Sequence, residues 1–213
     1  MSEAELEGGV RLTAEEIAAL DERWARHWTP SQLAGRLAGV AVPWYVAAGW
    51  ALDLFRGTQT RKHGDLEIAI PANRFAEIRA RFDGYAFDAV SSGKLWRNAA
   101  PGVIAATHQT WLRDPRTDDY LLDVFREPHD GDAWICRHDP TIRLPYDAVI
   151  RHSADGIPYL APELVLLFKS KQVRPKDEAD FEETLPHLDP DQRSTLAGLL
   201  ARVHPGHVWL DRL

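Results

Sequence analysis

The sequence predicts an α+β protein, with a body of mixed strands and helices over residues 1–157 and a helical region over residues 158–213. β-prone segments alternate with helical periodicities through the body, whereas the last part has capping Asp residues and few β signals. The 213 residues are 45% hydrophobic and 27% charged, which is enough for an ordinary globular core. This composition excludes a chain that is disordered throughout.

The first helix is expected at the N-terminus. Thr13 and Glu16 have the spacing of a capping box. Ile17, Leu20 and Trp24 then recur at helical intervals, so the helix is predicted to continue to about residue 24.

The bounds of the next elements are predicted from Gly and Pro residues, which indicate turns, and from local periodicity. Gly49 is expected at a strand-to-helix turn, and Gly57 is expected to end the helix that follows it. The predicted strands span residues 44–48, 65–70, 85–90, 103–112, 120–125 and 133–137. The predicted further helices span residues 30–37, 50–55, 73–82, 163–169, 177–185 and 189–203.

Charge and cysteine content exclude several functions. The chain has 25 Lys and Arg against 32 Asp and Glu, with no run of five like charges, so binding to duplex DNA or to an anionic membrane is not expected. The single cysteine, Cys136, cannot form an internal disulfide or a thiolate zinc site, which suits a reducing compartment. The N-terminus is acidic, and the longest charge-free apolar stretch, residues 39–52, is shorter than a membrane span. We therefore expect a cytoplasmic protein.

Residues 48–68 carry the clearest chemistry. Gly49 at a helix start would let backbone N–H groups approach a phosphate. Asp65 and Glu67 are two residues apart on a predicted strand, so their side chains share a face. Such a pair is costly to hold ionised unless a divalent cation lies between the carboxylates, and oxygen ligands favour Mg²⁺ or Mn²⁺. Arg61 and His63 precede this strand and are candidates to contact phosphate oxygens.

An acid pair on a strand is, taken alone, more often part of a solvated edge. The order of a glycine turn, a short helix and then an acid pair with apolar neighbours is what indicates phosphate and metal chemistry.

This order resembles the nucleotidyltransferase superfamily shared with DNA polymerase β. It is most similar to the aminoglycoside-2''-adenylyltransferase-like branch, which includes lincosamide nucleotidyltransferases. That branch typically reads Gly-Gly-Trp-Ala-hydrophobic-Asp, then Gly-x-x-Thr-Arg-x-His-x-Asp-hydrophobic-acid-Ile. The chain has Ala-Gly-Trp-Ala-Leu-Asp at residues 48–53 and Gly-Thr-Gln-Thr-Arg-Lys-His-Gly-Asp-Leu-Glu-Ile at residues 57–68. The resemblance continues at residues 108–111, 121–124, 131–134, 162–169 and 174–180.

The resemblance implies a nucleotidyltransferase fold, a mixed β-sheet flanked by helices, in residues 1–157. It also implies an enzyme that uses Mg²⁺ or Mn²⁺ and transfers a nucleoside monophosphate to an acceptor hydroxyl with release of pyrophosphate. The implied donor is ATP or another NTP, and the acceptor is a small hydroxylated molecule, such as an aminoglycoside- or lincosamide-like antibiotic.

The resemblance assigns residues to these roles one by one. Asp65, Glu67 and Asp123 are implied as metal-binding and catalytic, with Asp123 either a ligand or the general base toward the acceptor. The resemblance implies Gly49, Arg61 and His63 in nucleotide binding. The residues themselves add Trp50, which could stack on a base or sugar, and Lys169 or Lys176, which could reach the phosphates.

Two positions depart from the pattern of the branch or superfamily. Ala48 replaces the first glycine, which should narrow the allowed backbone angles, and Glu67 replaces the Asp that is commoner in the superfamily. They leave an alternative open: a non-catalytic nucleotide- or partner-binding module, or an antitoxin-type enzyme that modifies a protein, on the same fold.

Several other residues have a structural interpretation beside the functional one. A buried Arg partner would also explain Asp123, although the resemblance favours a metal-binding or general-base role. A solvated helix C-terminus would explain Lys169 as well as a phosphate contact would. Asp53 is expected to pair locally, and His108 to be a hydrogen-bonded strand residue. His204 and His207 have metal-like spacing, but the Pro-Gly between them favours a turn. Trp residues are expected to pack in the core.

Overall fold

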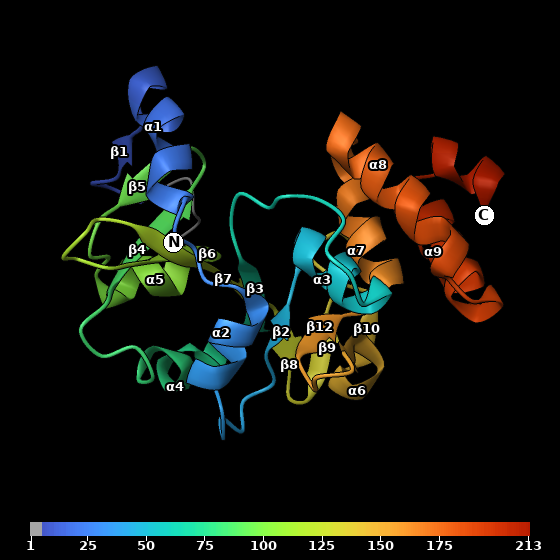
Figure 1. Ribbon diagram of the computed structural model, residues 1–213, viewed down its shortest axis with the longest axis horizontal. Coiled ribbons are helices and arrows are strands. Elements are labelled where there is room, and N and C mark those ends of the chain that lie inside the picture. Colours follow the sequence, from blue (N-terminus) through green and yellow to red (C-terminus); the bar gives the residue numbers. More distant parts are fainter. Residues whose placement is uncertain (1–5) are drawn as a thin grey trace. The chain divides into compact units, whose positions relative to one another are not determined.

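The computed structural model describes residues 6–213 (Figure 1). The described chain divides into two compact units, and it passes through each of them twice. Unit 1 comprises residues up to Trp44 together with His63–Glu127, and unit 2 comprises Tyr45–Lys62 together with Pro128–Leu213. The sequence predicts a different kind of boundary, between residues 157 and 158, where the C-terminal helical region begins. That boundary stays a prediction.

Unit 1 is built on six strands. In sheet order they are β1 (Val10–Arg11), β5 (Lys94–Trp96), β4 (Ala86–Ser91), β6 (Gln109–Arg113), β7 (Tyr120–Glu127) and β3 (Glu67–Pro71). Neighbouring strands are antiparallel except for β3 and β7, which are parallel. Strand β7 lies between β6 and β3 in the sheet, and nearly all of its residues are buried, so both of its faces are covered.

The helices of unit 1 are short. They are α1 (Ala14–Trp24), α2 (Pro30–Arg36), α4 (Phe75–Arg79), which follows the 3₁₀ turn η2 (Ala72–Arg74), and α5 (Pro101–Ala106). Capping boxes at Thr13 and Thr29 satisfy backbone N–H groups at the starts of α1 and α2. Trp24 at the end of α1 packs against Trp111 and Tyr120 of the sheet.

Unit 2 combines short strands with the longer helices. Strand β12 (Pro158–Leu160) pairs in parallel with β2 (Tyr45–Val46) and antiparallel with β11 (Ile150–His152). A separate sheet has the order β10 (Arg143–Pro145), β9 (Ala133–Ile135) and β8 (His129–Asp130). The helices are α3 (Ala48–Arg56), α6 (Tyr146–Val149), α7 (Pro162–Lys169), α8 (Pro175–Thr184) and α9 (Pro190–Val203), with 3₁₀ turns η3 (Ser170–Gln172), η4 (Leu185–His187) and η5 (Val208–Arg212).

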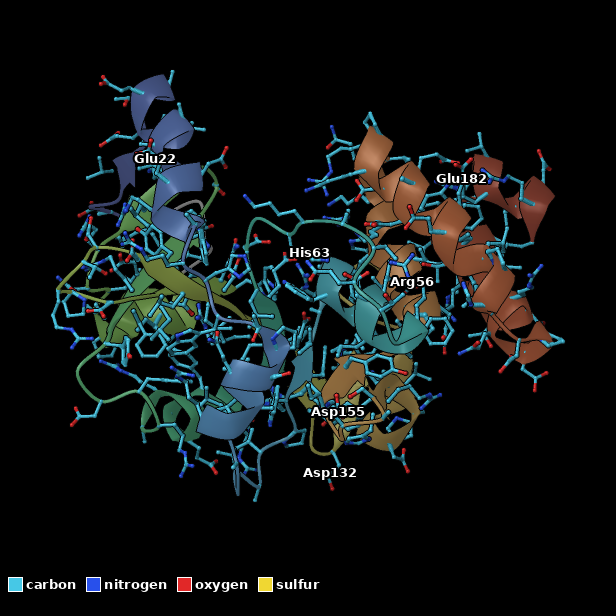
Figure 2. The ribbon with its side chains drawn as sticks, viewed as in Figure 1. Glu22, Arg56, His63, Asp132, Asp155 and Glu182 are labelled. Carbon is cyan, nitrogen blue, oxygen red and sulfur yellow. The ribbon has the colours of Figure 1, made fainter. Side chains whose placement is uncertain are left out.

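The core of unit 2 surrounds α7. Residues 162–167 of this helix are all buried, and it packs against α3 and α9. Trp209 of η5 stacks on Phe181 of α8 with ring centroids 4.2 Å apart. Exposed charged side chains cover the surfaces of the helices and loops, as Glu22 does in unit 1 and Asp132, Asp155 and Glu182 do in unit 2 (Figure 2).

The α+β class is confirmed, and so are the helices expected at 13–24, 30–37, 50–55, 163–169, 177–185 and 189–203. The strand expected over 103–112 is wrong in its first part, because residues 101–106 form α5. Pro101 occupies the first turn of that helix, where its missing N–H is not needed. The helix expected over 73–82 ends at Arg79.

Two details of residues 44–70 also differ from expectation. Gly49 is the second residue of α3, so the strand-to-helix turn falls at Ala47 and Ala48. Strand β3 begins at Glu67, so Asp65 lies in the segment that leads into it. Among residues 6–213 no helix is both long and apolar enough to cross a membrane.

Candidate active site

Three carboxylates meet in unit 1. Asp65, Glu67 and Asp123 each offer one carboxylate oxygen, and these oxygens all lie within 4.8 Å of one another. Asp123 is 3% exposed, whereas Asp65 and Glu67 are partly exposed. The three acids that the sequence predicts as metal ligands are therefore brought together at a place that is open on one side and buried on the other.

The parallel pairing of β3 and β7 produces this arrangement. Glu67 and Asp123 are Cα partners in the register, and the Asp123 N–H donates to the Leu66 carbonyl at 2.8 Å. Leu66 and Ile68 are buried, so the alternating residues Asp65 and Glu67 lie on the other side of the chain from this core. Apolar alternation thus fixes which side the acids occupy.

The electrostatics of Asp123 favour a cation. Burial, the negative charge of Glu67 and, more weakly, that of Asp65 raise the pKa of Asp123 well above its usual value. Hydrogen bonds donated by Gln109 and Trp111 oppose this rise. A divalent cation would remove the repulsion, since it would lie among three negative ligands.

The donor set matches Mg²⁺ or Mn²⁺. All three side chains supply carboxylate oxygens, which hard divalent cations prefer. The Oδ1 atom of Asp123 is buried and has no hydrogen-bond partner within residues 6–213, so a bound cation would satisfy it. The residues present therefore fit the metal that the sequence implies.

His63 also belongs to unit 1, next to the acid pair in sequence (Figure 2). It is buried, and its backbone carbonyl accepts a hydrogen bond from His27 Nε2 at 3.2 Å. This contact fixes the backbone two residues before Asp65.

The other predicted residues belong to unit 2. Gly49 is buried in the first turn of α3, and Trp50 beside it is partly exposed. The N-cap residue, Ala47, supplies no side-chain cap to this helix. Ala48 has φ of 50°, in the left-handed region that favours glycine. The motif that residues 48–53 resemble begins with glycine, and this chain holds alanine there in a strained conformation.

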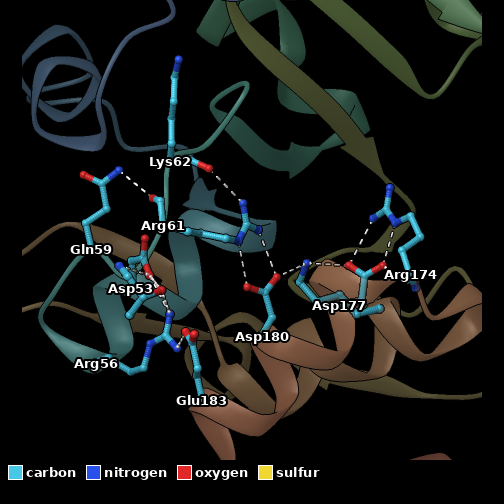
Figure 3. Close-up of polar contacts among 11 residues, drawn as sticks. Asp53, Arg56, Gln59, Arg61, Lys62, Arg174, Asp177, Asp180 and Glu183 are labelled. Carbon is cyan, nitrogen blue, oxygen red and sulfur yellow. Dashed lines mark hydrogen bonds and ion pairs between the residues drawn. The ribbon is translucent and has the colours of Figure 1, made fainter.

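Arg61 lies in a chain of alternating charges in unit 2 (Figure 3). Its Nε and Nη2 atoms both donate to the Asp180 carboxylate at 3.0 Å. Asp180 and Asp177 in turn share Lys169, whose Nζ lies 2.8 Å from Asp180 Oδ2 and 3.1 Å from Asp177 Oδ1. Arg174 completes the chain by donating from Nε and Nη2 to Asp177.

This chain of ion pairs lowers the pKa values of its two acids and so keeps them ionised. Burial would raise the pKa of Asp177, but hydrogen bonds from Arg174 and Lys169 more than offset it and lower the pKa to about 2. For Asp180 the hydrogen bonds from Arg61 and Lys169 likewise outweigh burial and lower the pKa. The Asp180 hydrogen bond raises the pKa of Arg61, so its guanidinium stays charged.

Lys169 and Lys176, the two lysines predicted to contact nucleotide phosphates, have different surroundings. The Lys169 side chain is 8% exposed and bridges Asp177 and Asp180, whereas Lys176 is exposed on α8. The Arg61 side chain, 28% exposed, keeps N–H groups beyond those used by Asp180 and the Lys62 carbonyl. Arg61 therefore has donors for a further anion, while Lys169 mainly organises the acids around it.

The residues for which the sequence favours a structural role make the contacts which that role predicts. Asp53 accepts from Arg56 and from the Thr60 N–H and hydroxyl, which is the local pairing expected (Figure 3). His108 Nδ1 donates to the Arg126 carbonyl at 2.8 Å. His207 accepts from the Trp209 N–H and donates to the Ser170 carbonyl, so it caps η5.

Sequence reasoning missed the partners of Asp123. Gln109 and Trp111 on β6 both donate to its Oδ2 atom. The available signal was the polar–apolar alternation of His-Gln-Thr-Trp at residues 108–111, but only the pairing of β6 with β7 reveals which acid these side chains contact.

The chain resembles known nucleotidyltransferases in sequence and in fold. The family model described as aminoglycoside-2''-adenylyltransferase matches residues 31–99. Among solved structures, the lincosamide antibiotic adenylyltransferase LnuA, with lincomycin bound, has TM-score 0.51 and 17% identity, and the alignment covers 83% of this chain and 98% of LnuA. ANT(2'')-Ia in complex with adenylyl-2''-tobramycin has TM-score 0.53 and 15% identity, over 81% of this chain and 95% of that one.

The solution structure of the antibiotic-resistance factor ANT(2'')-Ia gives TM-score 0.51 and 15% identity, over 89% of this chain and 94% of that one. A comparison with curated proteins gives no match. The nucleotidyltransferase fold is therefore confirmed, and so is the resemblance to the aminoglycoside and lincosamide nucleotidyltransferase branch that residues 48–68 predict.

Proposed function

We propose that the protein is a Mg²⁺-dependent nucleotidyltransferase that transfers AMP from ATP to a hydroxyl of a small-molecule acceptor and releases pyrophosphate. The observation that carries this proposal is the cluster of Asp65, Glu67 and Asp123, whose carboxylate oxygens lie within 4.8 Å on a nucleotidyltransferase fold. Three like charges held this close repel one another, which favours a site that takes up a cation.

In this proposal the three acids hold the divalent cation. When bound, the cation supplies electrostatic stabilisation to the α-phosphate as negative charge develops there. Asp65 and Glu67 are partly exposed and so are accessible to a solvated ion, while Asp123 closes the site from the buried side. Glu67 has one more methylene than the Asp of related sequences, and its oxygen still reaches the other two.

Asp123 also positions the attacking group. The acceptor hydroxyl would approach its carboxylate, which takes the hydroxyl proton as the acceptor oxygen bonds to the α-phosphorus. The bond between the α-phosphorus and the oxygen bridging to the β-phosphate breaks, and that oxygen leaves with pyrophosphate.

We propose that the triphosphate is bound by the residues that the sequence predicts to contact the nucleotide. Arg61 is charged and rigidly held by Asp180, and it keeps spare N–H donors, which suits a phosphate oxygen. Gly49 and Trp50 in the first turn of α3 present a helix N-terminus whose N–H groups have no side-chain cap. His63 is assigned the same ligand from the resemblance, and Lys176 is assigned it as an exposed cation of α8. Lys169 acts on this ligand through Asp180 and Arg61.

The acceptor class is drawn from the similar proteins. LnuA is described with lincomycin and ANT(2'')-Ia with adenylyl-2''-tobramycin, so the proposed acceptor is an aminoglycoside- or lincosamide-like antibiotic. The net charge of −7 favours a cationic acceptor such as an aminoglycoside. We place the reaction in the cytoplasm, where ATP is available and Cys136 stays reduced.

The first test is thermal unfolding with ATP, GTP, CTP and UTP, each with Mg²⁺ or with EDTA. A nucleotide at 100 times its Kd adds about 2.7 kcal/mol of stability. We expect a shift with ATP and Mg²⁺ that EDTA abolishes and that the Asp65→Asn/Glu67→Gln double variant lacks.

The second test is transfer of labelled AMP from ATP to tobramycin and to lincomycin. Labelled acceptor supports the enzyme, whereas Mg²⁺-dependent ATP binding without any labelled acceptor across a broad antibiotic panel favours the non-catalytic module. An absence of any nucleotide response would contradict the transferase proposal and favour a non-catalytic, partner-binding module.

A further inference from the structure

The side chains of β6 beside Asp123 have no role in the function proposed above. Gln109 Nε2 donates to Asp123 Oδ2, and Trp111 Nε1 donates to the same atom at 3.3 Å. The other oxygen, Oδ1, is buried and has no hydrogen-bond partner in the described residues. The two oxygens of one carboxylate are therefore in different environments.

The sheet register explains why these two residues reach Asp123. Trp111 is the Cα partner of Asp123, and Gln109 lies two residues away on the same face of β6. The intervening Thr110 is fully buried on the opposite face. Glu67 is the Cα partner of Asp123 on the other neighbouring strand, β3. Asp123 thus has neutral donors on one side and an acid on the other.

The two donors are suited to hold an ionised carboxylate. An amide NH₂ and an indole N–H both donate, and the indole nitrogen accepts nothing. The Trp111 ring is itself held by ring contacts with Tyr120 at 4.9 Å and Trp24 at 5.6 Å between centroids. Two donors that converge on one oxygen fix the rotation of the carboxylate, so that the orientation of the other oxygen is set before any ligand arrives.

We propose that Gln109 and Trp111 are positioning residues for the metal site: they bind Asp123 by Oδ2 and so present Oδ1 to the divalent cation. The inference rests on the proposed function, since it assigns this cation to the cluster of Asp65, Glu67 and Asp123. It predicts that the two residues contribute to metal affinity although neither provides a ligand atom.

The test is the affinity of the nucleotide-free chain for Mn²⁺, measured by the electron paramagnetic resonance signal of free Mn²⁺. Gln109→Met keeps the length of the side chain and removes its donor, and we expect about tenfold weaker Mn²⁺ binding. Trp111→Phe keeps an aromatic ring and removes the N–H, with a smaller loss because its hydrogen bond is longer. The matched control is Trp96→Phe, which removes an indole N–H that donates to the Glu7 carbonyl in the same unit, and it should leave the affinity unchanged.

Turnover provides a second measurement that a purely structural role would not move. Gln109→Met should raise the KM for Mn²⁺ and leave the KM for the acceptor unchanged, and excess Mn²⁺ should restore kcat. Where Gln109→Met does not fold, Trp111→Phe carries the same test.

The outcomes separate this inference from the function on which it rests. Wild-type Mn²⁺ affinity in folded Gln109→Met and Trp111→Phe would overturn the positioning role and leave the transferase proposal standing. A turnover defect that excess Mn²⁺ does not restore would also overturn it. Wild-type protein that binds no Mn²⁺ would remove the metal site, and both proposals would fail.

Discussion

The two units each hold a group of buried or half-buried acids, and the two groups have opposite electrostatics. In unit 1, Asp123 is held near Glu67 and Asp65, and burial with their charges raises its pKa. In unit 2, Asp177 and Asp180 are paired with Lys169, Arg61 and Arg174, and the pKa of each acid is lowered. Lysine and arginine side chains thus neutralise the acids of the group in unit 2, whereas the charges that act on Asp123 in unit 1 are those of two acids.

We interpret this difference as the one between the proposed metal site and a structural network. Buried ion pairs that are complete in the folded chain stabilise one arrangement of the helices that carry them. A cluster of acids that repel one another costs stability until a ligand neutralises it, and functional sites often have this property. The acids of unit 1 therefore carry the proposed chemistry, and those of unit 2 position Arg61.

The largest expected effect follows from removing one acid of unit 1. Asp65→Asn takes a charge from the metal site and should lower the rate of AMP transfer by at least about 10³-fold, equivalent to about 4 kcal/mol. The fold should be kept, since Asp65 is partly exposed. Single-turnover transfer, with thermal unfolding in EDTA as the control for folding, checks this. Wild-type turnover in the folded variant would contradict the assigned mechanism.

Removing one acid of the group in unit 2 should mainly lower the free energy of unfolding. Asp180→Asn leaves Lys169 and Arg61 without a shared partner, and breaking a buried pair in this way costs about 3 kcal/mol or more. For a chain of this size the melting temperature should fall by roughly 6–12 °C.

The matched control on the same helix is Glu183→Gln. Glu183 pairs with Arg56 but is 49% exposed, so its loss should change stability by less than about 1 kcal/mol. Equal melting temperatures for Asp180→Asn and Glu183→Gln would show that the network in unit 2 is not a stabilising one.

The pH dependence of stability should have opposite signs in the two groups. Asp177 has a pKa of about 2 when folded, below the ordinary value, so its stabilisation of about 2 kcal/mol is present above pH 4 and lost as the pH falls towards 2. The difference in unfolding free energy between wild type and Asp177→Asn should shrink over that range. Asp123 has a raised pKa, so without metal its ionisation destabilises the fold as the pH rises.

Asp123→Asn in EDTA should therefore match or exceed wild type in stability at pH 7, and the difference should fade as the pH is lowered towards 4. Denaturant unfolding across this pH range measures both variants. If Asp123 stabilised the fold at pH 7 in EDTA, the protein itself would already neutralise the charge of Asp123. The electrostatic difference between the two groups of acids would then be wrong.

The smallest effect concerns the backbone rather than charge. Ala48→Gly removes the left-handed strain at φ 50°, worth about 1 kcal/mol, and a gain of about 0.5 kcal/mol should remain after the added entropy of the unfolded chain. Ala197→Gly, within α9, is the control and should lose about 1 kcal/mol. Equal losses for both variants would show that Ala48 is not strained.

Much of the fold was predictable from local pattern. Capping boxes and periodicity predict α1, α2 and α9 because these signals act within a few residues. Residues 103–106 were predicted as the start of a strand because Val103 and Ile104 are β-prone, whereas the helical start at Pro101 decides the structure. The short strands β5 and β10 to β12 have no signal of their own, since their pairing supplies most of their stability.

The sequence by itself determined the acid pair Asp65 and Glu67, the substitution at Ala48 and the resemblance of residues 48–68, since each depends on neighbours along the chain. Only the tertiary structure decided that Asp123 meets this pair, that Gln109 and Trp111 hold it, and that Lys169 lies between two acids. The physical reason is that strand register and helix packing bring together residues far apart in the chain, and local periodicity carries no information about those pairings.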